Sequence, residues 1–215
     1  MDGQKRIIVW VSSILIVGIT AIAAWQIATS KTPDSRRTET LSEAVRATDH
    51  AKGAITPKAT LVEYSDFQCP ACGMFYPLIE KIFADHKDTL RFIYRHFPLP
   101  QHKNALAAAY ASEAAGKQDK FWEMHKLIFE NQNDWAETDT ATQTFEKYAR
   151  GLNLNLAKFK TDRDSQETKT RVEHDRTTGL ASGVNSTPSF YLNGKKLPNP
   201  KSEAEFMAMI EASLK

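Results

Sequence analysis

The chain has 215 residues, of which 41% are hydrophobic and 25% are charged, with nine Gly and nine Pro. This composition is that of a globular protein, and it excludes intrinsically disordered, collagen-like and disulfide-rich small proteins. The 28 Lys and Arg nearly balance the 26 Asp and Glu, so a net charge of +2 gives no sign of a nucleic-acid-binding surface. Only two cysteines are present, and both lie in one Cys-Pro-Ala-Cys unit, Cys69 to Cys72.

Residues 7–29 are predicted to form a transmembrane signal anchor. The segment carries no charge, and as a helix it would be ~35 Å long, enough for a hydrocarbon core of ~30 Å. Trp10 and Trp25 lie near its ends, where interfacial aromatic residues are favoured. A cleaved signal peptide, leaving a secreted or periplasmic protein, is the alternative, because residues 21–23 have the small-x-small pattern of a cleavage site. We expect residues 1–6 in the cytoplasm and the domain that follows the anchor outside it.

Residues 30–57 are polar and mixed in charge, with few large apolar side chains. Such a segment can bury little apolar surface, so it is predicted to be a linker in which residues 41–51 could form one short helix. The exported domain is then expected over residues 58–215.

The domain begins with a predicted strand, helix and strand. Residues 60–67 alternate apolar and polar side chains and are rich in β-forming types. Apolar residues then recur at spacings of three and four over residues 74–83, which is typical of one helix face. Residues 91–97 form a second strand that Pro98 ends. Two strands joined through a helix in one sheet imply a right-handed crossover.

A mostly helical insert follows at about residues 104–182. Its helices are predicted over residues 104–116, 120–132, 138–151 and 154–182. The mixed charged run at residues 161–176 is interpreted as a solvated face. Residues 189–192 form a short strand that ends at an Asn-Gly turn signal. Residues 195–197 return as a strand, and Ser202 caps a last amphipathic helix.

The segments around Cys69–Cys72 and around Thr187-Pro188 together resemble the DsbA-like family of extracytoplasmic thiol–disulfide oxidoreductases. The resemblance extends over about residues 59–215. It implies an α/β, thioredoxin-like fold with an inserted helical subdomain. A Cys-x-x-Cys between a strand and a helix, with a Thr-Pro before a short strand much later in the chain, is a specific combination.

The two cysteines suit thiol exchange. Cys69 would lie at the start of a helix, where unpaired backbone N–H groups and the helix dipole favour a thiolate. Pro70 suits the first helical position, and Cys72 lies one turn further and more buried. Because a disulfide that closes so short a loop adds little stability, it is better suited to exchange than to cross-linking. We therefore predict a redox-active Cys69–Cys72 disulfide.

The resemblance implies roles for five further residues. Glu63 would transfer a proton to or from the buried cysteine, with a pKa raised by burial; the alternative is a charge on the exposed face of an edge strand. Pro188 would be a cis proline beside the disulfide. Thr187 would present its backbone to an extended substrate, with Pro70 and Ala71 also in contact.

Alternatives to a disulfide donor remain open. Ala71 stands where the strongest oxidants of the family have His, which would stabilise the thiolate, so a reductase or isomerase direction is open. A structural disulfide or a metal-carrying domain is a further alternative, although no second Cys pair is present. We do not favour His96 and His102 as metal ligands. The other four histidines are interpreted as surface or satisfied residues, namely His50, His86, His125 and His174. We expect no metal and no cofactor.

The resemblance also implies partners. They are reduced or unfolded exported proteins as substrates and a membrane redox partner of the DsbB or VKOR type, with no nucleic acid. Residues 30–57 are too short for a dimerisation domain, so a monomer is expected.

Overall fold

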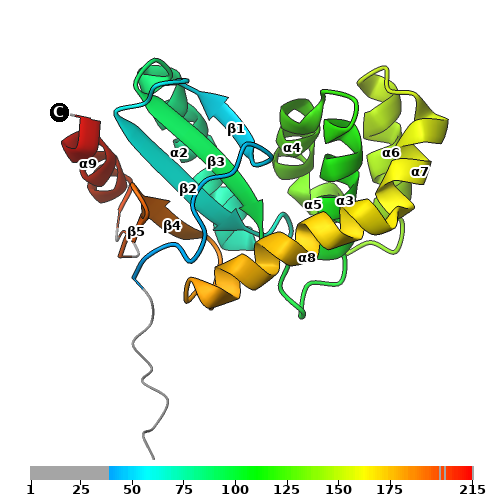
Figure 1. Ribbon diagram of the computed structural model, residues 1–215. Coiled ribbons are helices and arrows are strands. Elements are labelled where there is room, and N and C mark those ends of the chain that lie inside the picture. Colours follow the sequence, from blue (N-terminus) through cyan, green and yellow to red (C-terminus); the bar gives the residue numbers. More distant parts are fainter. Residues whose placement is uncertain (1–38, 199, 201, 215) are drawn as a thin grey trace, which may run out of the picture. The chain divides into compact units, whose positions relative to one another are not determined.

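A computed structural model describes residues 39–198, 200 and 202–214. Within them five strands form one mixed sheet in the order β1-β3-β2-β4-β5 (Figure 1). The strands are β1 (His50–Gly53), β2 (Ala59–Ser65), β3 (Leu90–His96), β4 (Ser189–Leu192) and β5 (Lys195–Lys196). Strands β2 and β3 are parallel, and the other pairs are antiparallel. The predicted crossover from β2 to β3 is therefore present.

The helices fall into two groups. Helix α2 (Pro70–His86) makes the crossover, and α9 (Glu203–Leu214) ends the described chain. The insert expected over residues 104–182 consists of α3 (Ala105–Gly116), α4 (Phe121–Glu130), α5 (Gln132–Trp135), α6 (Ala141–Gly151), α7 (Leu156–Asp164) and α8 (Gln166–Ala181). Figure 1 shows these six helices gathered beside the sheet, with α8 running back to it.

One predicted helix of the insert is in fact two. A single helix was predicted over residues 154–182, but the chain is extended at Ser165, with φ −68° and ψ 150°. The Ser165 hydroxyl accepts a hydrogen bond from the Thr168 N–H at 3.2 Å. This N-cap starts α8 in a new direction after α7 ends.

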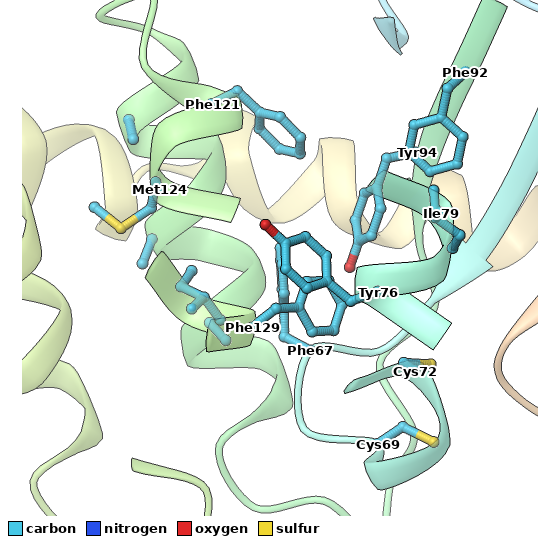
Figure 2. Packing of buried hydrophobic residues seen from close by; sticks show 14 of the residues in the cluster. Phe67, Cys69, Cys72, Tyr76, Ile79, Phe92, Tyr94, Phe121, Met124 and Phe129 are labelled. Carbon is cyan, nitrogen blue, oxygen red and sulfur yellow. The ribbon is translucent and has the colours of Figure 1, made fainter. Parts of the chain in front are cut away.

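Side chains bury both faces of the central strand β2. On one face, Leu61 joins the main core with Phe92, α2 and the insert; on the other, Val62 and Tyr64 join a smaller cluster. Figure 2 shows part of the main core, which extends to both cysteines. Because neither face of β2 meets solvent, a polar side chain on this strand is enclosed in the protein interior.

The predicted linker is partly wrong. Residues 50–53, assigned to it from their polarity, form β1 and pair antiparallel with β3. The short helix expected over residues 41–51 is absent. Instead, the Leu41 N–H donates to the Gly194 carbonyl at 2.9 Å, and Thr40 bridges to Lys195. Long-range backbone pairing, which composition does not reveal, holds this segment on the domain.

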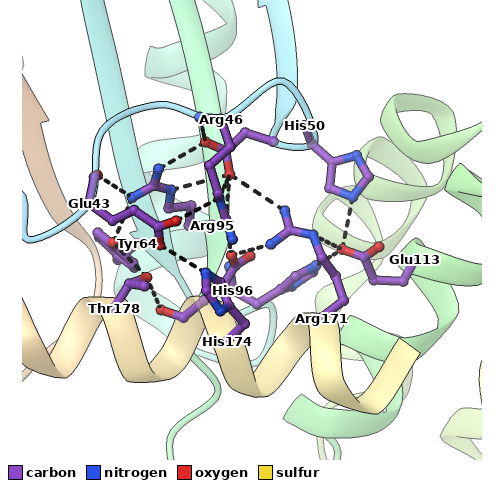
Figure 3. A network of polar contacts seen from close by, with 12 residues as sticks. Glu43, Arg46, His50, Tyr64, Arg95, His96, Glu113, Arg171, His174 and Thr178 are labelled. Atoms are coloured by element: carbon purple, nitrogen blue, oxygen red, sulfur yellow. Dashed lines mark hydrogen bonds and ion pairs between the residues drawn. The ribbon is translucent and has the colours of Figure 1, made fainter. Parts of the chain in front are cut away.

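The charged run at residues 161–176 is also not simply a solvated face. Asp175 is fully buried and forms ion pairs with Arg46, at 2.5 Å, and with Arg171. A second buried pair joins Arg95 to Asp49 at 2.9 Å. Figure 3 shows how these groups connect the N-terminal segment, β3 and α8. Buried charges of this kind are tolerated because each has a partner of opposite sign.

The transmembrane segment expected at residues 7–29, the tail at residues 1–6 and the first part of the linker lie outside the described residues. No helix in the part of the chain that the structure describes is long and apolar enough to cross a membrane.

Candidate active site

The Cys-Pro-Ala-Cys unit lies where the crossover helix begins. Cys69 is the N-cap of α2 with extended backbone angles, and Pro70 is the first helical residue. The Cys69 carbonyl accepts the first helical hydrogen bond, from the Gly73 N–H at 3.1 Å. Cys72 lies one turn into the helix and is fully buried. Both cysteines are free thiols, so the structure describes the reduced site.

The two thiols differ in acidity. The pKa of Cys69 is lowered to about 5, first by the hydrogen bond from the Cys72 thiol and further by the backbone N–H groups of Ala71 and Cys72. Burial raises the pKa of Cys72 well above its usual value, and the negative groups at Cys69 and Glu63 raise it further. At neutral pH the reduced site therefore holds a thiolate at Cys69 and a neutral thiol at Cys72.

The loop before β4 lies against Cys69. The Thr187–Pro188 peptide bond is cis, and Cys69 Sγ lies 3.4 Å from the Thr187 carbonyl oxygen, to which Cys69 can donate only in its protonated form. Strand β4 starts directly afterwards and pairs with β2, with Ser189 opposite Tyr64. This pairing brings residues far apart in sequence into one site. Pro70 is exposed and Ala71 is half-buried, so the motif presents part of its surface to solvent.

Glu63 lies in the interior beneath the helix start. Glu63 is only 2% exposed, which excludes the alternative that it is a charged residue on an exposed face of the strand. Burial raises the pKa of the Glu63 carboxyl to about 7, against the opposing effects of the Ser65 hydroxyl and Lys52. A carboxyl with this pKa can give up and take back a proton near neutral pH, next to a thiol whose acidity it affects.

Polar side chains that the sequence analysis did not single out hold the motif in place. The Asp66 carboxylate accepts hydrogen bonds from the Gln68 N–H and Leu99 N–H, both at 2.8 Å, and from His102 Nδ1 at 2.7 Å. From the insert, the Gln132 amide donates to the Phe67 carbonyl at 2.7 Å and to the Cys69 carbonyl at 3.0 Å. These contacts tie the approach to Cys69 to the insert.

The sequence held only a partial signal for these contacts. Asp66 and Gln68 are polar residues between a strand and the motif, and that position could have marked them. Gln132 lies far from the motif in sequence, so nothing local links it to Cys69.

One cluster among the described residues has the side chains of a metal site. His50, His96 and Glu113 place ligand atoms within 4.8 Å of one another. Both imidazole Nε2 atoms contact the same Glu113 oxygen, at 2.8 and 2.9 Å, and the Arg171 Nε lies 3.8 Å from it. Although burial opposes this effect, hydrogen bonds from the two histidines lower the pKa of Glu113 well below its usual range. These cationic and hydrogen-bonding groups already compensate the carboxylate, and a divalent ion would be repelled by Arg171.

Of the histidines expected at the surface or satisfied, His125 differs from that expectation. His50 and His174 have carboxylate partners, Glu113 and Glu43. His125, expected at the surface or satisfied, is buried in the aromatic core, and its Nε2 has no hydrogen-bond partner. His102 contacts Asp66 rather than His96.

Comparison with known proteins agrees with this geometry. The family model for thioredoxin matches residues 46–212. The solved structure of BdbD from Bacillus subtilis in its oxidised form is 28% identical, with a TM-score of 0.67 over 77% of this chain and 92% of that one. Alpha-DsbA1 from Wolbachia pipientis is 21% identical, with a TM-score of 0.68 over 79% and 92%. A periplasmic thioredoxin-like protein from Salmonella enterica is 20% identical, with a TM-score of 0.62 over 76% and 88%.

Curated relatives match over part of their length. The Na(+)/H(+) antiporter NhaA 3 of Salinispora tropica is 35% identical over 153 residues, which are 71% of this chain and 22% of that protein. The Na(+)/H(+) antiporter NhaA of Herminiimonas arsenicoxydans is 34% identical over 165 residues, 77% of this chain and 25% of that protein. This chain thus spans about a quarter of the length of these relatives.

The family match extends across the sheet, the insert and both halves of the site. It agrees with the strand order, the helix that begins at the cysteine pair and the proline loop beside it. The chain therefore belongs to the thioredoxin family.

Proposed function

We propose that this enzyme donates its Cys69–Cys72 disulfide to reduced protein chains outside the cytoplasm. The observation that carries the direction is the opposite pKa shift of the two thiols, down to about 5 for Cys69 and upward for Cys72. A thiolate that is stable at neutral pH stabilises the reduced site, and it makes Cys69 a good leaving group. The disulfide is then an oxidant even though Ala71 lacks the positive charge of a histidine.

The reaction has two exchange steps. A substrate thiolate attacks Cys69 Sγ, the bond between the two sulfurs breaks, and Cys72 leaves with the electron pair and takes up a proton. A second substrate thiolate then attacks the substrate sulfur of the mixed disulfide and expels Cys69 as a thiolate. The substrate has lost two electrons and gained a disulfide, and the enzyme holds the thiolate and thiol described above. Glu63 supplies the proton that Cys72 takes up in the first step.

Substrate binding is assigned to the surface around the helix start. An extended chain would lie along the Thr187-Pro188 loop as an added strand. Beside the motif, a cleft of about 510 Å³ has an apolar part and a polar rim, with Met74 72% exposed. Its lining residues are Met74, Phe75, Pro77, Leu78 and Pro200, together with Lys81, Ser202 and Glu203. Apolar side chains that water still reaches are suited to unfolded chains, which expose apolar residues.

The cellular setting extends this proposal. We place the domain on the extracytoplasmic side as a monomer, anchored by residues 7–29. A membrane partner of the DsbB or VKOR type would restore the disulfide. The compartment of the Salmonella relative, described as periplasmic, supports this placement.

The test is the reduction potential of the Cys69–Cys72 pair, together with oxidation of a reduced, unfolded protein that has several cysteines. We expect turnover that Cys69→Ser abolishes, and a Cys72→Ser variant that traps mixed disulfides through Cys69. A potential as low as that of a structural disulfide would overturn the proposed direction. Rearrangement of scrambled disulfides without net oxidation would instead support an isomerase.

A further inference from the structure

Several buried polar atoms beside the redox site have no hydrogen-bond partner. Among the described residues, Ser65 Oγ, Tyr94 OH and His125 Nε2 are in this group. Almost all buried polar groups in proteins are hydrogen-bonded, and an unpaired one lowers stability. Three such atoms on one side of the sheet therefore call for a functional explanation.

Tyr94 and Glu63 project into the same space. They are direct partners across the parallel β2–β3 pair, so their side chains leave the same face of the sheet. Ser65 follows two residues after Glu63 and shares that face. Tyr94 is completely buried, with its ring stacked on Phe67 at 5.1 Å and perpendicular to His125 at 4.8 Å. These contacts hold the phenol in place without using its hydroxyl.

The hydroxyl lies on the side of the core where helix α2 begins. Figure 2 shows the phenol oxygen of Tyr94 on the side that faces the first turns of α2, where Cys72 lies. Burial raises the pKa of Tyr94 well above its usual value, and negative charge on Glu63 and Cys72 raises it further. The Ser65 hydroxyl acts to lower the pKa of both Glu63 and Tyr94, against the effect of burial. Ser65 therefore lies beside both groups. The phenol thus remains neutral and keeps one proton to donate and lone pairs to accept another.

Building on the proposed function, we propose that Tyr94 is a proton-relay residue that, with the Ser65 hydroxyl, connects the Glu63 carboxyl to the Cys72 sulfur. When the disulfide opens, the Glu63 carboxyl gives its proton toward the phenol oxygen, and the phenol gives its own proton toward the Cys72 thiolate. Each transfer passes through one bridging water, because the phenol oxygen has no hydrogen-bond partner among the described residues. Tyr94 ends as it began, Glu63 is a carboxylate and Cys72 is a thiol. Re-oxidation moves the proton in the reverse direction.

The test is Tyr94→Phe, which removes only the unpaired hydroxyl and leaves the ring contacts. We expect stability to be kept or increased. Reduction of the oxidised enzyme by dithiothreitol, corrected for the thiolate fraction of the reagent, should slow about tenfold or more at pH 7, since positioned proton transfer contributes ~10²–10⁴-fold. The solvent isotope effect in D₂O should fall, and the inflection near pH 7 should weaken.

The matched control is Tyr191→Phe. Its hydroxyl donates to the Ser182 carbonyl at 2.7 Å, on the other face of the sheet. This variant should lose stability and keep the wild-type rate and isotope effect. Should Tyr94→Phe fold poorly, 3-fluorotyrosine at position 94 keeps the ring and hydroxyl but changes the phenol acidity, and it should shift the pH profile.

The outcomes separate the two proposals. A wild-type rate, pH profile and isotope effect in Tyr94→Phe, or an unshifted profile with 3-fluorotyrosine, would overturn the relay and leave the disulfide-donor function standing. The opposite combination of results would overturn the donor function and retain the relay. In that case the wild-type enzyme oxidises no protein thiols, while Tyr94→Phe still slows its reduction by dithiothreitol as described.

Discussion

Replacing Cys72 with alanine should raise the pKa of Cys69 from about 5. The first cause of that low value is the hydrogen bond from the Cys72 thiol to the Cys69 sulfur. A hydrogen bond to a charged group contributes ~1.5–3 kcal/mol, and 1.36 kcal/mol corresponds to one pKa unit, so the expected increase is ~1–2 units. At pH 7 the thiolate fraction of Cys69 would then fall from about 99% to between about 50% and 90%.

The assay is the thiolate absorbance of the reduced protein as a function of pH, with the rate of alkylation by iodoacetamide as a second measurement. Cys72→Ser is the matched control because its hydroxyl can still donate, so its Cys69 should titrate closer to wild type. An alanine variant that titrates with the wild-type midpoint would refute the reasoning. In that case the backbone N–H groups at the start of α2 would be sufficient to set the pKa.

Three further predictions concern the interior. Wild-type stability should fall as the pH rises from 4.5, the usual carboxyl pKa, to about 7, because Glu63 loses its proton in the unfolded chain and retains it in the folded one. The total loss is about 3 kcal/mol. It should be absent in Glu63→Gln when urea unfolding is measured at several pH values. Arg95→Met leaves buried Asp49 without one of its partners and should lower the unfolding free energy by ~3–5 kcal/mol, whereas a loss within experimental error in chemical denaturation would contradict a structural ion pair. Gly179→Ala would place a Cβ 2.6 Å from the Phe97 ring and should cost ~1–3 kcal/mol; an unchanged thermal midpoint would mean that the ring moves freely.

Local patterns were sufficient to predict the frame of the domain. The alternation before Cys69, the apolar periodicity after it and the Asn-Gly turn after β4 are each encoded within a few residues. Hence the strand–helix–strand unit, the helical insert and the last hairpin and helix lie where the patterns indicated. The two cysteines and the proline loop also come together in the structure.

The remainder depends on partners distant in the chain. Strand β1 is short and polar, and it forms because the edge of β3 is available to it. Arg95 reads as a polar residue in a strand, and it is buried only because Asp49 and backbone carbonyls of the preceding segment surround it. Gln132 and Tyr94 belong to the site through tertiary packing alone. No window of sequence contains both members of any of these pairs.

The position of β1 at the sheet edge has a practical consequence for producing the catalytic domain. A fragment that starts at residue 58, where the polar segment ends, would expose the backbone N–H and C=O groups along β3. Such an open edge is a template for pairing with other chains, so that fragment should aggregate. Expression of a soluble domain therefore has to begin at or before Glu39, whose carbonyl accepts the Lys196 N–H at 2.6 Å.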